Sequence, residues 1–354
     1  MSCGSALGYD PRLGKIIPLA PDSEPDLWRV AVPGDEPAIV YRRCVNLNTA
    51  AVCNWLVAVE VVGMAPQAYC LSCRLTRTVP DLSIVENARL WRFLEDAKRQ
   101  VISALAGLGL PLASRVSEDP ERGLAFDFLQ SPEGGLRVLT GHRDGLITLN
   151  IEEADDVHRE RMRTSLHEPY RTLVGHFRHE VGLYYWDRLV ADSPWLESFR
   201  ALFGDERADY AAALRMNYQH GPPPQWPLRY VSAYASTHPW EDWAETWAHY
   251  LHMVDALGTA LSFGIGPDAI AMPFDCFLPE ALYDPGRPGA EQFLGLVNSW
   301  LKLTSVLNEL CRSMGQPDFY PFALPGAAVR KLHFVHLVIC DASPLAAWVV
   351  KLRS

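Results

Sequence analysis

Long stretches of the chain carry apolar residues at the spacing of an α-helix. The first runs from Asn87 to Ala106, where apolar positions recur every three or four residues among strong helix formers, and Gly107 and Pro111 end the pattern. The same spacing predicts further helices, which span residues 170–189, 194–203, 206–216, 239–257, 290–314, 327–340 and 346–352. From residue 81 onward we therefore expect a mainly helical chain.

Apolar and polar residues alternate between the first two of these helices, which predicts strands. Residues 123–130 alternate, residues 131–135 form a turn, and residues 136–151 contain two short apolar runs. These runs are separated by the sequence His-Arg-Asp-Gly at 142–145, which is typical of a hairpin turn. We expect a small antiparallel sheet of about three strands.

Residues 1–80 differ in composition from the rest of the chain. They contain five of the eight cysteines, many turn residues and no long helical pattern. The composition shifts at Pro80, so we expect one domain over residues 1–80 and a second over residues 81–354.

Four cysteines of the N-terminal segment have the spacing of a metal site. Cys70 and Cys73 form a Cys-x-x-Cys pair, the usual knuckle of a zinc ribbon, and Cys44 and Cys53 precede them. Four thiolates in a short segment with little core make a good tetrahedral site for structural Zn²⁺. A redox role would require a helix after the pair, whereas the sequence TVPDLS soon follows.

The other cysteines have weaker contexts. Cys3 resembles the end of a further knuckle that has been truncated or lost, so we expect it to bind nothing stably. Cys276, Cys311 and Cys340 lie among apolar residues and are expected in the core.

The charge and hydropathy of the chain argue against some classes of partner. The 354 residues carry a formal net charge of −10, and an acidic surface argues against nucleic acid as the main partner. Neither a leader-like segment nor an apolar run of about eighteen residues appears, so no membrane association is expected. We expect a cytoplasmic protein, in which cysteines bind metal or lie buried rather than forming disulfides.

His179 and Glu180 begin the pattern His-Glu-x-x-His on a predicted helix. Two histidines four residues apart share one face of a helix and can bind one Zn²⁺, and the glutamate acts as general base on a zinc-bound water. Here the fourth following residue is Leu183, which has no metal-binding atom.

A second predicted helix carries two carboxylates four residues apart, Glu241 and Glu245. One could supply a further zinc ligand, and the other could orient a ligand histidine through its free ring nitrogen. Tyr234 lies seven residues before Glu241, and its phenol could stabilise the oxyanion of a tetrahedral intermediate.

These motifs resemble the bacterial zinc-binding metallopeptidases that join a zinc-ribbon N-terminus to a gluzincin-type protease domain. The resemblance covers nearly the whole chain. It rests on LGYDP at 7–11, YRRC at 41–44, CNWLV at 53–57, CRLTRTVPDLS at 73–83, HFRHEVG at 176–182, YYWDRLV at 184–190 and AYASTHPWEDWAETWAHYLH at 233–252. It implies an α+β protein, with a small zinc ribbon followed by a mainly helical zincin-like domain containing a small antiparallel sheet.

The resemblance also implies roles for single residues. His179 would be a zinc ligand, Glu180 the general base, and the helix with Glu241 and Glu245 the source of the third ligand. Similarity to the wider gluzincins favours Glu241 as the ligand and Glu245 as the carboxylate that supports it.

Leu183 departs from the family pattern, which has histidine at this position. Two protein ligands make a poor catalytic zinc site, because such a site normally has three and a water. His176 is a candidate substitute, although it lies one turn toward the wrong end of the helix. His249 and His252 either extend the polar network of the site or are structural histidines with partners of their own.

Three functions are therefore open. The first is a zinc-dependent peptidase, impaired by Leu183, that binds peptide along an edge strand at residues 144–152. A plain structural strand is the equal alternative for that segment. The second is a catalytically silent homologue that binds a peptide or protein, and the third is a zinc-ribbon interaction module on a large scaffold.

Overall fold

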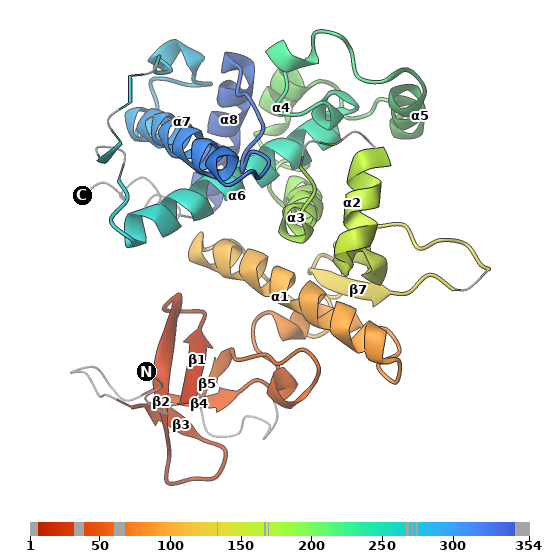
Figure 1. Ribbon diagram of the computed structural model, residues 1–354, viewed down its shortest axis with the longest axis vertical. Coiled ribbons are helices and arrows are strands. Elements are labelled where there is room, and N and C mark those ends of the chain that lie inside the picture. Colours follow the sequence, from red (N-terminus) through yellow and green to blue (C-terminus); the bar gives the residue numbers. More distant parts are fainter. Residues whose placement is uncertain are drawn as a thin grey trace. The chain divides into compact units, whose positions relative to one another are not determined.

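The computed structural model describes residues 6–31, 39–59, 68–132, 134–165, 168, 170–266, 269–270, 272–273 and 275–343. By its internal contacts the chain divides into two compact units, residues 1–165 and 166–354 (Figure 1). The domain boundary that the shift in composition predicts near residue 80 stays a prediction.

The N-terminal strands form a five-stranded antiparallel sheet in the order β1-β2-β3-β4-β5. Alternate residues of these strands are buried, and Ile17, Leu19, Tyr41 and Leu56 pack together on one face. The strands are β1 (Ala6–Asp10), β2 (Lys15–Pro21), β3 (Trp28–Val30), β4 (Val40–Arg43) and β5 (Leu56–Ala58). The absence of a helical pattern in this segment is thus explained by short, paired strands.

A second sheet has four strands in the order β6-β7-β9-β8. The strands are β6 (Thr76–Thr78), β7 (Ala125–Leu129), β8 (Gly141–Arg143) and β9 (Leu146–Asn150). Only β8 and β9 are antiparallel, while β7 pairs in parallel with both β6 and β9. The expected antiparallel sheet is therefore a mixed one, because the chain after β7 returns through irregular structure before it enters the β8-β9 hairpin.

The strand expected at an edge lies inside this sheet. β9 is paired on both sides, by β7 and by β8, and the edges are β6 and β8. The predicted turn is the reason: Asp144 and Gly145 both have positive φ, which suits a two-residue hairpin and folds β8 back over β9. The expectation that residues 144–152 offer a free edge to peptide is wrong.

Helix α1 (Val85–Gly107) confirms the first predicted helix and buries its apolar stripe, which includes Leu90, Leu94, Val101 and Leu105. It also buries charged side chains that the pattern does not predict. A short helix, α2 (Asp156–Ser165), closes this unit and was not expected from the sequence.

The second unit is helical, as predicted. Its helices are α3 (Leu173–Leu189), α4 (Leu196–Phe203), α5 (Tyr210–His220), α6 (Pro239–Ser262), α7 (Ala290–Ser313) and α8 (Gly326–Ala342). α6 packs against α3, α4, α7 and α8 and so lies at the centre of this unit (Figure 1). The helix predicted at 346–352 falls outside the described residues.

Local sequence signals set where α3 and α6 begin. α3 begins at Leu173 rather than near Tyr170, because the Thr172 side chain accepts a hydrogen bond from the Gly175 amide at 3.0 Å. α6 begins at Pro239 as expected, with His238 at the capping position.

α3 and α6 approach closely at Gly182. A Cβ atom there would lie 3.1 Å from Cδ1 of Trp247 and 3.2 Å from Cα of Ala244. The Trp243 indole also donates a hydrogen bond to the Gly182 carbonyl at 2.8 Å. A side chain here would crowd this contact, which therefore favours glycine.

Within the described ranges, no helix combines the length and the apolar character needed to cross a membrane.

Replacing Gly182 tests this packing. We expect Gly182→Val to lower the free energy of unfolding by about 1–3 kcal/mol, because the new side chain overpacks the α3–α6 contact. Gly258→Val is the matched control, since Gly258 lies in α6 and a Cβ there would meet no atom within 4 Å. Urea denaturation measures both changes, and equal midpoints for the two variants would contradict the prediction.

Candidate functional site

The four ribbon cysteines converge on one buried point. Cys44 follows β4, Cys53 precedes β5, and Cys70 and Cys73 form the knuckle before β6. All four are buried, and their sulfur atoms lie within 4.8 Å of one another. The backbone amides of Cys70 and Cys73 donate hydrogen bonds to the sulfurs of Cys44 and Cys70, each at 3.4 Å.

These sulfur atoms fit a zinc ion. Sulfurs at about 2.3 Å from a tetrahedral zinc are about 3.8 Å apart, and the sulfurs of Cys53 and Cys70 are separated by 3.6 Å. None of the described cysteines forms a disulfide, so the thiols are free to bind metal. Burial raises the pKa of Cys70, and a divalent cation would offset that cost of deprotonation.

The remaining cysteines take no part in this group. Cys3 lies outside the described residues. Cys276 is exposed and Cys311 and Cys340 are half-buried, so the expectation that they belong to the core is wrong. Cys276 lies in a loop, where its apolar neighbours in sequence do not imply burial.

The second candidate site is built on His179, which lies between two carboxylates of α6. His179 Nε2 is 3.0 Å from Glu241 Oε2, and His179 Nδ1 is 2.8 Å from Glu245 Oε1. Glu241 and Glu245 lie one turn apart on α6, so both can face the same imidazole across the α3–α6 contact.

The two contacts differ in kind. Nδ1 and Glu245 are hydrogen-bonded, and since a carboxylate accepts, Nδ1–H donates. Ser232 Oγ donates to the other oxygen of Glu245 at 2.7 Å, which fixes this carboxylate. Glu241 Oε2 is buried and accepts no hydrogen bond of good geometry from the residues that the structure describes, although Nε2 is near it.

This pairing is what a metal-binding histidine requires. A ligand histidine commonly donates its other ring N–H to a carboxylate, and that contact fixes its orientation. Two donors at about 2.1 Å from one zinc lie about 3.4 Å apart. The separation of Nε2 and Glu241 Oε2 is compatible with two ligands of one ion.

A third ligand is missing. Leu183 lies one turn after His179 and offers no donor. Across the described part of the chain, the four cysteines form the one group of three or more potential ligands, so neither His176 nor another such side chain completes the set. The residues present therefore do not fit a catalytic zinc with three protein ligands.

Glu180 has the environment of a proton acceptor or donor near neutral pH. Burial raises the pKa of its carboxyl to about 7. Its Oε2 atom is buried and, within the described residues, has no hydrogen-bond partner. Buried carboxylate oxygens are usually hydrogen-bonded, so this oxygen is available to accept a proton or a hydrogen bond.

Two tyrosines surround these groups. The Tyr234 ring lies 6.0 Å from the His179 ring, and burial raises the pKa of its phenol. The Tyr210 hydroxyl donates a hydrogen bond to Glu241 Oε1, the oxygen that does not face His179. Sequence reasoning missed Tyr210, and no motif marks it: its one local signal is Asp209, which caps α5 through the Ala212 amide.

His249 and His252 have partners of their own. His249 Nδ1 is hydrogen-bonded to the Tyr320 hydroxyl, and His252 Nδ1 is paired with Arg178. Arg178 in turn pairs with Asp255. They are satisfied structural histidines rather than additional members of the site.

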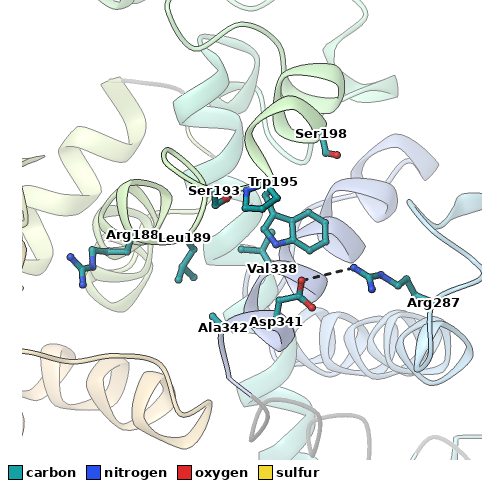
Figure 2. A pocket seen from close by; sticks show the side chains of 10 residues that line it. Arg188, Leu189, Ser193, Trp195, Ser198, Arg287, Val338, Asp341 and Ala342 are labelled. Carbon is teal, nitrogen blue, oxygen red and sulfur yellow. Dashed lines mark hydrogen bonds and ion pairs between the residues drawn. The ribbon is translucent and has the colours of Figure 1, made fainter.

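A shallow pocket of about 520 Å³ lies elsewhere in the second unit. Figure 2 shows Trp195 and the Arg287–Asp341 ion pair, at 3.9 Å, at this pocket. None of the residues that line it belongs to the His179 site. The pocket is therefore separate from the His179 site.

Comparison with known proteins identifies a family for each of the two segments that carry these residues. A family model described as "putative zinc-binding metallo-peptidase" matches residues 87–338, and a zinc-ribbon domain model matches residues 1–84. The chain belongs to this metallopeptidase family. The resemblance to zinc-binding metallopeptidases with a zinc-ribbon N-terminus is thus confirmed, as is the α+β fold, while the gluzincin assignment stays a prediction.

Relatives of the family extend over most of the chain. Proteins of Mycobacterium bovis and of two Mycobacterium tuberculosis strains, described as uncharacterized, are 41% identical to it over 345 residues. The alignments cover 97% of this chain and 91% of each relative. No solved structure matches the chain.

The His179–Glu245 pair predicts a pH-dependent stability in metal-free protein. Burial raises the pKa of Glu245, but the hydrogen bond and charge of His179 outweigh it and lower the value to about 2. The contribution of this carboxylate is present above its unfolded pKa of about 4.3 and is lost as pH falls toward 2. Burial lowers the pKa of His179, yet Glu241 and Glu245 raise it well above normal, so its contribution is full below about pH 6.5.

We therefore expect Glu245→Gln to destabilise EDTA-treated protein most between about pH 4.5 and 6.5, by about 1–3 kcal/mol. The deficit should shrink as pH falls toward 2 and as it rises through the folded pKa of His179. Urea denaturation across this range is the measurement, with exposed Glu309→Gln as the control. A deficit that is greatest at the lowest pH would contradict the assignment.

Proposed function

We propose that this chain is a zinc metallopeptidase homologue whose hydrolytic chemistry is impaired because Leu183 removes one zinc ligand. The observation that carries the proposal is the placement of His179 between Glu241 and Glu245, with a leucine one turn further along α3. The arrangement retains two donors and their support, and lacks the third.

The residues of the site take the roles that the family pattern implies. His179 and Glu241 are the remaining metal donors, and Glu245 orients His179. Glu180 is the proton acceptor, supported by its buried carboxyl and raised pKa. Tyr234 is the candidate for oxyanion stabilisation.

In zinc peptidases the metal lowers the pKa of a bound water and so supplies the nucleophile. With two protein ligands this chain is expected to hold the ion weakly. We therefore assign no hydrolytic step to the chain as it stands.

A silent homologue that binds a peptide or protein is the second candidate, and Leu183 is the observation that favours it. Such a module would keep the fold and lose the reaction. In either case the proposed partner is a peptide or protein, and the net charge of −10 argues against nucleic acid. The proposal places the protein in the cytoplasm, because the ribbon thiols must stay reduced to bind zinc.

Zinc content tests the missing ligand. The chain as it stands should retain about one zinc after gel filtration, held by the four cysteines. Leu183→His should retain about two, because it restores the third donor. Leu189→His, the same change on the same helix, is the control and should retain one.

Two outcomes would overturn the proposal. If the unaltered chain holds two zincs and loses one on Glu241→Ala, Leu183 has not disabled the site. If Leu183→His gains neither zinc nor activity, the loss of this ligand alone does not explain the impairment.

Peptide hydrolysis separates the two candidate functions. Leu183→His should cleave a library of fluorescence-quenched peptides that the unaltered chain leaves intact. Adding Glu180→Gln should lower that rate by about 10²–10⁴-fold while zinc content stays constant, because a general base is removed and no ligand is lost. Cleavage by the unaltered chain that depends on Glu180 would contradict the silent homologue.

A further inference from the structure

Helix α1 buries three charged side chains close to the ribbon cysteines. Glu95 and Lys98 have no exposed side-chain surface, and Arg99 is also buried. Burying charges is costly unless each has a partner of opposite sign or a good hydrogen bond. We name Glu95, Lys98 and Arg99 the α1 charge cluster.

Glu95 and Lys98 lie beside the knuckle formed by Cys70 and Cys73. The Cys73 sulfur is 3.9 Å from Glu95 Oε2. Lys98 Nζ donates to Glu95 Oε1 at 2.9 Å and to Thr76 Oγ1, while Thr76 Oγ1 donates to Glu95 Oε1 at 2.6 Å. Lys98 therefore neutralises a carboxylate that would otherwise repel a thiolate at Cys73.

Arg99 reaches the loop on the other side of the cysteines. Its Nη2 donates to the Ala51 carbonyl at 3.0 Å, two residues before Cys53, and it also pairs with Asp96. Burial lowers the pKa of Arg99, but nearby negative charges outweigh burial and raise the pKa overall. The charge of Cys53 is the largest of them.

One nitrogen of Arg99 is left over. Nη1 is buried and makes no hydrogen bond within the described residues, and its ion-pair contact with Glu95 Oε2 is long, at 3.9 Å. Buried guanidinium nitrogens are usually hydrogen-bonded, so Nη1 is available to a nearby acceptor. A cysteine thiolate bound to zinc is such an acceptor.

The net charge of the zinc centre explains why a cation beside it is stabilising. Zn²⁺ with four thiolates carries a net charge of −2, and this centre is buried. The low polarity around it makes nearby cations stabilising, and groups around the first ligands tune metal affinity. Glu95 and Lys98 cancel, and the Asp96 carboxylate that pairs with Arg99 is about half exposed, which leaves Arg99 as the buried positive charge of the cluster without a buried counter-ion of its own.

We propose that Arg99 is a positioning residue of the ribbon zinc centre: it holds the Ala51 carbonyl in the loop that carries Cys53 and places its positive charge beside the thiolates, while Lys98 neutralises Glu95 beside Cys73. The cysteines lie in the segment matched by the ribbon model, residues 1–84, and α1 lies almost entirely in the segment matched by the peptidase model, residues 87–338. Zinc binding by the ribbon is therefore coupled to the packing of a helix from the peptidase segment.

Zinc release tests Arg99 directly. We expect Arg99→Gln to weaken zinc binding by about 10–100-fold, the usual effect of removing a partner of a metal ligand. Release from the full-length protein to 4-(2-pyridylazo)resorcinol measures it. Arg92→Gln is the matched control, because Arg92 is on the same helix with a side chain 54% exposed, and it should release zinc at the unaltered rate.

A folding defect alone would give a different pattern. Arg99→Lys keeps the charge and the fold but loses the second donor, so its zinc affinity should fall between those of the unaltered chain and Arg99→Gln. The gain in melting temperature on zinc addition should shrink in the same order. If both variants melt earlier but keep the unaltered zinc affinity and the unaltered gain, Arg99 is merely structural and the proposal fails.

Hydrogen exchange tests the coupling in the unaltered protein. Removing zinc by chelation should increase exchange at the amides of α1 and leave α7 unchanged. Equal protection of α1 with and without zinc would overturn the coupling.

Discussion

The imidazole of His179, held by two carboxylates, is the contact on which the second unit depends. It requires α3 and α6 to approach closely, and Gly182 permits this because a side chain there would collide with Trp247 and Ala244. Ser232 and Tyr210 then fix the outer oxygens of Glu245 and Glu241. The close packing of α3 and α6 therefore also sets the geometry of the site.

Leu183 interrupts this arrangement at a single point. Its neighbours on α3 still place His179 against Glu241 and Glu245 of α6, so the helices keep the arrangement of the site although Leu183 offers no metal donor. The cost falls on metal affinity, since each ligand lost from a small tetrahedral site removes a large share of the binding energy. In the function that we propose, the fold is kept while the hydrolytic chemistry is impaired.

The first unit depends on a different balance, between buried thiols and buried charges. Four cysteines from one sheet and its knuckle lie beside Glu95, Lys98 and Arg99 of α1. Neither group is well accommodated alone, because crowded thiolates need cations and buried cations need acceptors. The ribbon and α1 consequently belong to one compact unit.

The sequence by itself determined most of the helices, the four-cysteine group and the His179, Glu180, Glu241 and Glu245 motif residues, because helical spacing and ligand spacing are local properties. Which oxygen meets which nitrogen of His179 was decided only by the packing of α6 on α3. The parallel pairing of β7 with β9, the contact of Tyr210 with Glu241 and the burial of Lys98 were also set by tertiary structure. Each joins segments far apart in the chain, and no local period records such a contact.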